Sequence, residues 1–330
     1  MPFRSNPNLH TILPPEKWQG TPTDKNGRFA NHEFPFDVKF LDVLRWKIKG
    51  NPQAKEKLSD KWTPPIANDT DWLHNNKNCI VWLGHATFFI RLNNTQIVTD
   101  PVFGNLSVIM KRAAPFGINP NKLKNIDLLL LSHDHRDHLD KPSIQHFIKN
   151  NPQASILTGL EMDGILRQWN VKNELQTAGW YQQYDTQKEN INVFFMPARH
   201  WSRRGVTDTN KRLWGSFLLQ VNNTTIYFSG DTGHGNHLKQ LNELFGDIDY
   251  FICGIGAYKP EWFMHSNHIS PQNAIKAANE MQAKNFIPMH YGTFDLSDET
   301  ISEPIKELQK YQQQLQANLL IPHLTQAIYF

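Results

Sequence analysis

The sequence has little cysteine, no long apolar run and no clear excess of charge of one sign. Only Cys79 and Cys253 occur among 330 residues, each within an apolar stretch, which favours buried reduced thiols over a disulfide framework. They would pair only if the fold made them neighbours. No window holds the roughly 18 apolar residues of a membrane-spanning helix, and residues 1–18 lack the apolar segment of a secretory signal. We therefore expect a cytoplasmic protein, with peripheral membrane contact as an open alternative.

Charge and composition argue against several classes of protein. The chain carries 34 basic and 31 acidic residues, and a net charge of +3 does not indicate attraction to nucleic acid or to a membrane. With 39% hydrophobic and 20% charged residues, the composition is that of a globular protein rather than a disordered one. A chain of 330 residues is long enough for one large domain or two small ones.

Residues 1–75 differ in composition from the rest of the chain. They are rich in Pro, Asn, Lys and aromatic residues and have little periodicity, although residues 38–49 could form one helix or one strand. We interpret them as an extension that wraps the core, because their apolar content is too low for independent folding. The expected anchors of this extension are Trp18, Phe34, Phe36, Trp46 and Trp62. Residues 76–330 are expected to form the main domain.

In residues 76–330, short apolar runs bounded by polar turns alternate with stretches of helical spacing. Residues 78–92 and 95–103 predict two strands joined by a turn at Asn93 and Asn94. Further strands are predicted at 126–132, 155–159, 192–198, 215–221, 224–231, 250–256 and 285–290. Helices are predicted at 141–151, 236–246, 271–283 and 301–317. Strands followed by helices, twice over, predict an α/β architecture of two mixed sheets with helices outside.

The nine residues SHDHRDHLD, at 132–140, concentrate three histidines and three aspartates in one turn. Imidazole and carboxylate are ligands of zinc and similar ions, and hydrolytic metal sites keep a position open for water. His133 and His135 are two residues apart after a predicted strand, so both side chains can face one ion. Asp137 and His138 follow after the chain turns and can face a second ion. A polar turn without metal is the plain alternative.

A two-metal site needs further ligands from other strand ends. His200, Asp231 and His290 each follow an apolar run that predicts a strand, and α/β sheets place their ligands at such ends. Taken alone, each of the three is as easily a polar strand end as a metal ligand. Together with the pattern HDHRDH they predict one shared metal site.

These residues carry a resemblance to a known family. HDHRDH with the later histidines and aspartate resembles the metallo-β-lactamase-fold hydrolases. VWLGHATFFI, TDPVF, PARHWSRRG, FSGDTG, GAYKPEWFM and HYGTF narrow the resemblance to the N-acylphosphatidylethanolamine-hydrolysing phospholipase D branch. Residues 78–300 carry it, and WLGHA and TDP are weaker evidence because ascorbate-phosphate lactonase-like proteins share them.

The resemblance implies a four-layer αββα sandwich with two divalent ions at one edge of the sheets. Zinc is the expected metal, with iron and manganese as alternatives. The first ion is expected on His133, His135 and His200. The resemblance further implies that Asp137, His138 and His290 hold the second ion and that Asp231 bridges the two.

The hypothesis for the mechanism is that a metal-bridged hydroxide attacks phosphorus, with Asp137 orienting it as well as binding metal. Asp100 in VTDP is expected to hold a ligand imidazole in the right tautomer, or else to form a turn before Pro101. His268 is assigned by the resemblance to substrate contact or to protonation of the leaving group. A water-exposed neighbour of the following helix is the alternative for His268. For His85 we favour a structural role over a place in the pocket.

Two stretches bear on the substrate. Arg199, with Arg203 and Arg204, concentrates positive charge beside His200, as an anionic phosphate would require. A solvated basic loop is the alternative. The bulky EWFMHS segment, residues 261–266, could receive acyl chains, touch a bilayer or belong to the core.

The favoured function is a metal-dependent phosphodiesterase of the phospholipase D type acting on N-acylphosphatidylethanolamine-like lipids. A lactonase or phosphoesterase with a small soluble substrate is the alternative, and a wide apolar groove would favour the lipid. A metal-binding sensor without turnover is a third hypothesis. A nuclease ranks last because no Lys- or Arg-rich arm is present, and no nucleic-acid partner is expected. The sequence makes no prediction about oligomeric state.

Overall fold

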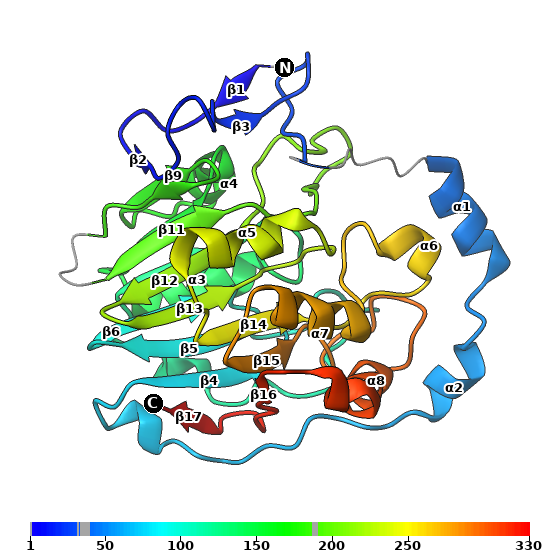
Figure 1. Cartoon of the computed structure of the whole chain (residues 1–330). Helices are drawn as coiled ribbons and strands as arrows, with labels where there is room; N and C mark the ends of the chain where they lie inside the picture. Colours follow the sequence, from blue (N-terminus) through cyan, green and yellow to red (C-terminus); the bar gives the residue numbers. More distant parts are fainter. Residues whose placement is uncertain (1, 32, 34–39, 187–190) are drawn as a thin grey trace.

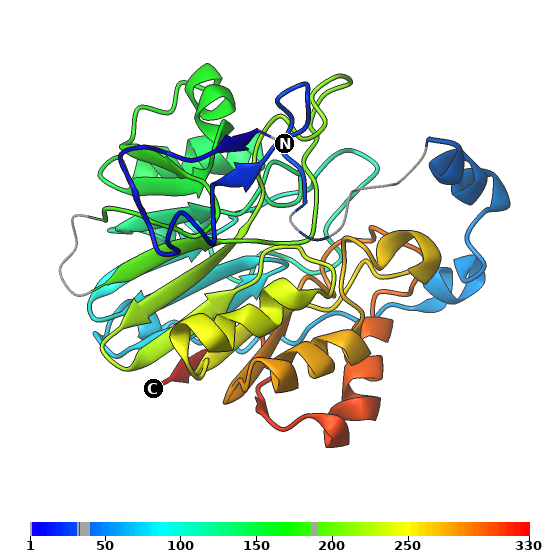
Figure 2. The ribbon, with the colours of Figure 1, turned by 45° about the horizontal axis from the view of Figure 1, so that its top comes forward.

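Two β-sheets face each other at the centre of the molecule, and helices cover the outer face of each (Figures 1 and 2). The computed structural model describes residues 2–31, 33, 40–186 and 191–330. The arrangement is the predicted four-layer αββα sandwich. No helix in these described ranges has both the length and the apolar content to cross a bilayer.

One sheet has seven strands, antiparallel from β17 to β6 and parallel from β6 to β9. Its strands, in spatial order, are β17 (Ala327–Tyr329), β4 (Cys79–Gly84), β5 (Thr87–Leu92), β6 (Thr95–Thr99), β7 (Leu128–Leu131), β8 (Ser155–Gly159) and β9 (Leu175–Ala178). The helices α3 (Lys141–Asn150) and α4 (Met162–Gln168) pack on its outer face.

The other sheet has eight strands, parallel from β16 to β13 and antiparallel from β13 to β2. Its strands are β16 (Asn318–Leu319), β15 (Asn285–Met289), β14 (Tyr250–Gly254), β13 (Thr224–Phe228), β12 (Ser216–Val221), β11 (Asn192–Met196), β10 (Gln182–Gln183) and β2 (His10–Thr11). On its outer face lie α5 (Asn236–Phe245), α7 (Pro271–Glu280) and α8 (Glu303–Tyr311) (Figure 1). Short 3₁₀ turns occupy Asp71–Leu73, Pro120–Lys122 and Gln312–Gln314.

Most predicted elements occur within a few residues of their expected bounds, but the prediction of one strand over residues 78–92 was wrong. The run divides into β4 and β5, because Gly84 (φ +115°) and His85 (φ +55°) turn the chain and the register shifts there. Left-handed φ values end an extended strand, and Gly adopts them without steric cost. The Gly84-His85 pair inside this apolar run was the one sequence feature that could have indicated the turn.

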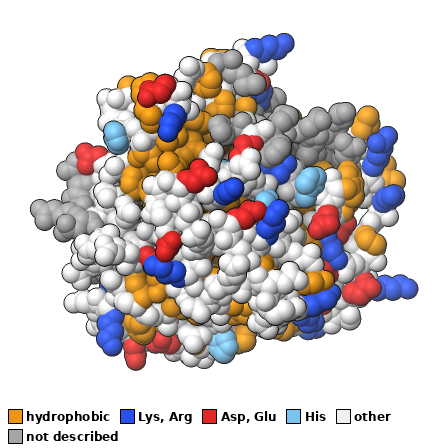
Figure 3. All heavy atoms as spheres, in the orientation of Figure 1, with side chains coloured by type: hydrophobic (Ala, Val, Ile, Leu, Met, Phe, Trp, Pro, Cys, Tyr) orange, Lys and Arg blue, Asp and Glu red, His pale blue; other side chains and the backbone are white. Residues whose placement is uncertain are grey.

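The described N-terminal segments lie along the outside of the sandwich (Figure 1). β1 (Phe3–Arg4) pairs with β3 (Thr21–Pro22), and α1 (Phe40–Lys49) and α2 (Ala54–Ser59) follow at the right-hand edge of Figure 1. In the same orientation, Figure 3 shows Lys and Arg side chains beside hydrophobic ones along that edge. Three of the predicted anchors pack on aromatic rings of the main domain: Trp18 on Tyr181, Trp46 on Phe263 and Trp62 on Tyr291. Phe34 and Phe36 lie outside the described residues. The division at residue 75 stays a prediction.

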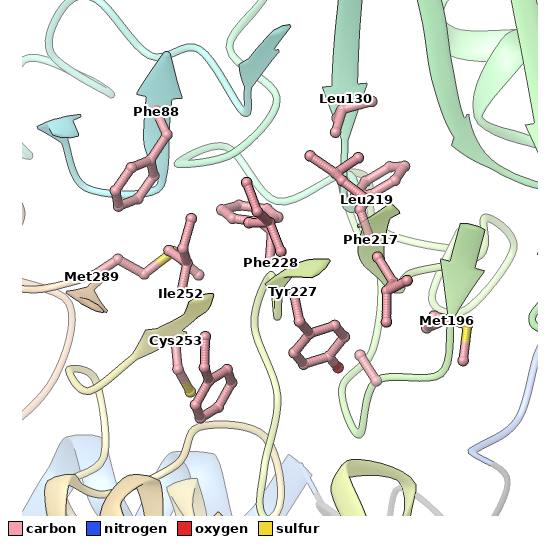
Figure 4. Close-up of a cluster of buried hydrophobic side chains, with 14 of the residues drawn as sticks. Phe88, Leu130, Met196, Phe217, Leu219, Tyr227, Phe228, Ile252, Cys253 and Met289 are labelled. Atoms are coloured by element: carbon pink, nitrogen blue, oxygen red, sulfur yellow. The ribbon is translucent and has the colours of Figure 1, made fainter. Parts of the chain in front are cut away.

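The main core fills the space between the sheets. In Figure 4, Phe88 and Leu130 from the seven-stranded sheet face Phe228 and Ile252 from the eight-stranded sheet, and all four side chains are buried. Cys253, next in the chain after Ile252, points toward the helices, because successive side chains of a strand alternate between its two faces. The alternation gives each sheet two buried faces, as continuous apolar runs such as Leu128–Leu131 require.

We expect both thiols to resist modification in the folded protein. Cys79 and Cys253 are free and fully buried, and burial raises the pKa of the Cys79 thiol to about 11 and that of Cys253 to about 12. Titration with a thiol-specific chromophore should detect essentially no thiol in native protein and two per chain in guanidinium. Rapid labelling of either cysteine without denaturant would contradict this packing.

Candidate metal centre

Four candidate ligands lie on the turn between β7 and α3. The buried strand β7 ends at Leu131, and α3 begins behind Asp140, whose carboxylate accepts a hydrogen bond from the Ser143 backbone N–H at 3.0 Å. Such an N-cap satisfies an orphan donor of the first helical turn and fixes where the helix starts. The intervening residues must therefore turn within a short distance, and the His138 N–H donates to the His135 carbonyl at 3.1 Å.

The first group of donors joins both sheets. His135 Nδ1 lies 3.0 Å from Nε2 of His133 and 3.0 Å from Nε2 of His200, which follows β11. Asp231, which follows β13, places Oδ2 3.9 Å from His133 Nε2 and 3.8 Å from His200 Nε2. Donors about 2.1 Å from one tetrahedral ion would be roughly 3.4 Å apart, so this spacing fits a metal.

The second group shares the Asp231 carboxylate. Asp231 Oδ2 lies 3.2 Å from Nε2 of His138 and 3.2 Å from Nε2 of His290, which follows β15. Asp137 Oδ2 lies 3.6 Å from His138 Nε2 and 3.3 Å from His290 Nε2. The structure therefore brings all seven predicted ligands together, in the two predicted sets, with one oxygen of Asp231 common to both.

Hydrogen bonds at the outer nitrogens orient three of the imidazoles. His200 Nδ1 donates to the Asn267 carbonyl at 3.0 Å, and His133 Nδ1 lies 2.9 Å from Ser132 Oγ. His138 Nδ1 lies 2.8 Å from Asp100 Oδ2. With Nδ1 engaged, each ring presents Nε2 to the centre, which is how outer partners select the tautomer of a metal-binding histidine.

Asp100 is the buried carboxylate behind His138. It also accepts hydrogen bonds from Ser132, through the backbone N–H at 2.8 Å and the hydroxyl at 2.5 Å. Asp100 thus ties the end of β6 to the end of β7 as well as holding His138 Nδ1. This is the position that the orienting role predicted for Asp100 requires.

His85, for which the sequence favoured a structural role, lies beside the second group of donors. Its Nε2 lies 3.0 Å from Asp137 Oδ2, and its ring lies 4.0 Å from the His290 ring, centroid to centroid. The His85 carbonyl accepts a hydrogen bond from the His290 N–H. His85 therefore positions two candidate ligands of the second group and is close enough to belong to it.

The backbone is strained at three of these residues. His85, Asp100 and His290 have φ values of +55°, +32° and +59°. Left-handed conformations of this kind cost non-glycine residues roughly 1–3 kcal/mol each and persist only where surrounding contacts hold them. The three lie at strand ends that converge on the donors. The left-handed backbone at these residues therefore helps to direct the donor side chains toward the centre.

Burial and mutual attraction set the protonation of the donors. Burial lowers the pKa of His133, His135 and His200, which keeps these imidazoles neutral and able to bind metal. Burial opposes the charged form of His290 as well, but the Asp231 and Asp137 carboxylates together outweigh it and raise the pKa to about 9. Burial works against ionisation of Asp137 and Asp231, yet the imidazoles, His138 foremost, hold both pKa values well below the usual range.

Unpaired buried atoms show that the donor set fits divalent cations. Within the described residues, Nε2 of His138, Nε2 of His290 and Oδ1 of Asp231 are buried without a hydrogen-bond partner. Leaving such polar atoms unmatched costs about 1–3 kcal/mol each, and most buried polar atoms in proteins are paired. A cation at each group would supply the missing partner and displace the protons that the carboxylates now attract to His138 and His290.

Hydrogen bonds anchor the basic loop after β11 to the ligand turn. Arg199, which begins this loop, does not line the cavity beside the metal centre. Buried Asp134 accepts hydrogen bonds from the Arg203 N–H at 2.9 Å and from Arg212 Nε at 2.6 Å. The Arg199 guanidinium donates to the His234 carbonyl at 2.8 Å, among residues away from the donors. Arg203 and Arg136 line the cavity beside the metal centre in its place.

That cavity has a volume of about 720 Å³ and opens directly over the donors. His135, Asp137 and Asp231 form part of its floor. His268 lines it as predicted, with Nδ1 3.7 Å from Asp231 Oδ2, and burial lowers the pKa of His268 to about 4. Its apolar walls come from separated segments of the chain: Trp46, Leu106, Met110, Trp201, Phe263 and Met264.

A family model described as the β-lactamase superfamily domain matches residues 95–291, which include all seven donors. The chain belongs to the metallo-β-lactamase superfamily. Within that superfamily it is 32% identical over 286 residues to N-acyl-phosphatidylethanolamine-hydrolyzing phospholipase D 1 of Caenorhabditis elegans, covering 82% of this chain and 80% of the relative. The mitochondrial protein of that name from Saccharomyces cerevisiae is 34% identical, over 69% of this chain and 50% of the relative.

Solved structures agree with the fold. A metallo hydrolase from Ignicoccus hospitalis matches with a TM-score of 0.59 at 18% identity, over 77% of this chain and 98% of the other. A diiron β-hydroxylase from Streptomyces venezuelae matches with a TM-score of 0.58 at 16% identity, over 78% of this chain and 55% of the other. At such identities the likeness concerns the fold alone. The family and the donor set together make this chain a metal-dependent hydrolase of the superfamily.

Asp100→Asn should weaken metal binding without removing a ligand. Loss of the carboxylate behind His138 leaves Nδ1 of its ring without a charged partner, and changes of this kind cost about 10- to 100-fold in metal affinity. Competition against a chromogenic chelator would measure the affinity, with the exposed Asp163→Asn as the matched control. Equal affinities for both variants and wild type would remove this role from Asp100.

Removal of metal should lower thermal stability. The seven donors are drawn from both sheets, and a cation present at 1,000 times its dissociation constant stabilises the folded state by about 4 kcal/mol. We expect protein dialysed against a chelator to melt at least about 5 °C lower, with recovery on addition of zinc. Calorimetry of both forms provides the comparison, and identical melting temperatures would contradict a metal shared by the two sheets.

Proposed function

We propose that the protein is a phosphodiesterase of the phospholipase D type that acts on N-acylphosphatidylethanolamine-like lipids. The observation that carries the proposal is a wide, largely apolar cavity placed directly over two adjoining groups of metal donors. A small polar metabolite has no need of walls built from Trp46, Trp201 and Phe263, whereas acyl chains do. The names of the relatives from Caenorhabditis elegans and Saccharomyces cerevisiae point to the same substrate class.

The polar part of the cavity suits a phosphodiester. Arg136 and Arg203 stand on its wall, and guanidinium groups bind phosphate oxygens with charge-assisted hydrogen bonds. Donors of the centre line the same cavity. A phosphate bound there would meet positive charge from the guanidinium groups and from the metals, while its acyl chains contact the apolar walls.

Two metal ions, held by the two donor groups that share Asp231, would supply positive charge to the phosphate and lower the pKa of bound water. In the reaction, water oxygen bonds to phosphorus and the bond from phosphorus to the ethanolamine oxygen breaks. The Asp137 carboxylate is unprotonated and accepts the proton of the attacking water. His268 lines the same cavity, where its neutral imidazole can donate an N–H hydrogen bond to the leaving oxygen. The leaving oxygen takes up the proton that Asp137 has accepted.

His135→Ala is the decisive variant. It removes a donor shared by the two close contacts of the first group, so metal content should fall and release of an N-acylethanolamine should drop by about 10³-fold or more. Elemental analysis and a lipid hydrolysis assay on the same preparations measure both. The exposed His323→Ala serves as the matched histidine control and should behave as wild type.

The outcomes separate the enzyme from its substrate. About two metals per wild-type chain with lipid turnover that the variant loses would support the proposal. Metal without lipid turnover would end the lipid assignment and leave the hydrolase, directing the search to lactones and soluble phosphodiesters. Absence of metal in protein purified without chelator would overturn the metal centre itself.

A further inference from the structure

A short segment of the N-terminal extension lies against the loop that follows β11 (Figures 1 and 2). The Phe29 N–H donates to the Asn210 carbonyl at 2.8 Å, and the Arg28 guanidinium donates to the Thr207 carbonyl at 3.1 Å. The Phe29 side chain is buried, which fixes the segment in place. The extension thus holds the far end of a loop whose near end is the candidate ligand His200.

Asn31 makes the contact at the near end of this loop. Its Nδ2 donates to the His200 carbonyl at 2.9 Å, and its Oδ1 accepts from the His200 backbone N–H at 3.2 Å. Within the described part of the chain, no other residue is hydrogen-bonded to the His200 backbone. His200 is fully buried, so loss of the Asn31 amide would leave a buried N–H and a buried C=O without partners.

The position of the His200 backbone decides where its imidazole can reach. The ring is held at one end, where Nδ1 lies 3.0 Å from the carbonyl of Asn267, the third residue after α6 (Glu261–Met264). At the other end, Nε2 lies 3.0 Å from His135 Nδ1 in the first donor group. A functional side chain must be held within about 0.5 Å of its working geometry. Asn31 supplies the backbone anchor that this accuracy requires.

Glu33 gives the extension a second contact, on the segment that follows Asp231. Its carboxylate accepts a hydrogen bond from the N–H of Asn236, the first residue of α5, at 2.9 Å. The N-cap residue of this helix, Gly235, has no side chain to serve its orphan N–H groups, and a carboxylate also suits the positive end of the helix dipole. The extension therefore contacts the segments behind two donors of the eight-stranded sheet, His200 and Asp231.

We propose that Asn31 is a positioning residue of the metal centre, whose side-chain amide fixes the His200 backbone and thereby the affinity of the first donor group for its ion. The described part of the extension provides none of the donors, yet through Asn31 it sets the place of one of them. Without the amide, His200 shifts to find other partners for its backbone, and the ion bound through it is held less tightly. This role does not depend on the lipid substrate, because metal binding is measured without substrate.

Cobalt(II) binding to the full chain tests the role of Asn31. Asn31→Asp keeps the size of the side chain but sets a carboxylate oxygen against the His200 carbonyl oxygen, and Asn31→Ala removes both hydrogen bonds. In competition with a chromogenic chelator, each variant should bind one of two ions about 10- to 100-fold more weakly than wild type. The visible absorption bands of the bound cobalt should change as well, because they report the geometry of its ligands.

Asn6→Ala is the matched control. Asn6 is likewise a half-buried asparagine of the extension, whose Nδ2 donates to the Thr177 carbonyl at 2.7 Å and whose Oδ1 accepts from the Asn8 N–H at 3.0 Å. The substitution removes a similar pair of hydrogen bonds at β9, a strand that carries none of the donors. It should leave cobalt affinity and the cobalt spectrum as in wild type.

The outcomes are distinct. Weaker binding of one ion and an altered cobalt spectrum in the Asn31 variants, with neither change in Asn6→Ala, support the positioning role. If Asn31→Ala does not fold, the isosteric Asn31→Asp decides alone. Wild-type affinity and spectrum in Asn31→Asp overturn the proposal, and so does an equal loss of affinity in Asn6→Ala, which would indicate general destabilisation. Wild type that binds cobalt but releases no N-acylethanolamine with any metal would remove the proposed substrate and leave the role of Asn31 intact.

Discussion

The structure depends on holding two carboxylates, the buried Asp231 and the largely buried Asp137, among imidazoles at one end of a two-sheet sandwich. Buried charge is costly unless it is paired, and here the only pairing the described residues offer is partial, with several donor atoms unmatched. Divalent cations at the two donor groups would offset this cost. The surrounding features follow from the need to hold donors for them: helix caps after the ligand turn, a carboxylate behind His138 and left-handed backbone at strand ends.

The donors could be predicted from the sequence because their spacing depends on local geometry. HDHRDH directly follows a buried strand, and His200, Asp231 and His290 each follow another, so the topology of an α/β sheet is enough to bring them together. Family resemblance added the division into two sets. Strands and helices could be predicted where polar turns bounded an apolar run. The boundary between β4 and β5 could not, because only Gly84 and His85 turn the chain inside one continuous apolar run.

Other features were set by contacts between distant residues, which a sequence pattern does not record. His85 gains its place from the Asp137 carboxylate, 52 positions away, and from the His290 backbone. Arg199 was expected at the substrate because it adjoins His200, yet adjacent side chains point in different directions, and Arg136 and Arg203 take the cavity wall. The path of α1 likewise follows from the bond between Trp46 and Asp298, which no periodicity in residues 1–75 could indicate.

The division of the donors between the sheets has a consequence for how substitutions will act. The seven-stranded sheet carries the ligand turn, and the eight-stranded sheet carries His200, Asp231 and His290. Neither half of the sandwich therefore holds all the members of either donor group. Phe88 and Phe228, one from each sheet, pack together in the core between the sheets, with their ring centroids 6.3 Å apart. A change of volume in that layer shifts one half of the donor set against the other. Substitutions that disturb the core far from the donors should therefore lower the amount of bound metal. Selection for catalytic activity will then also constrain core residues that never contact a substrate.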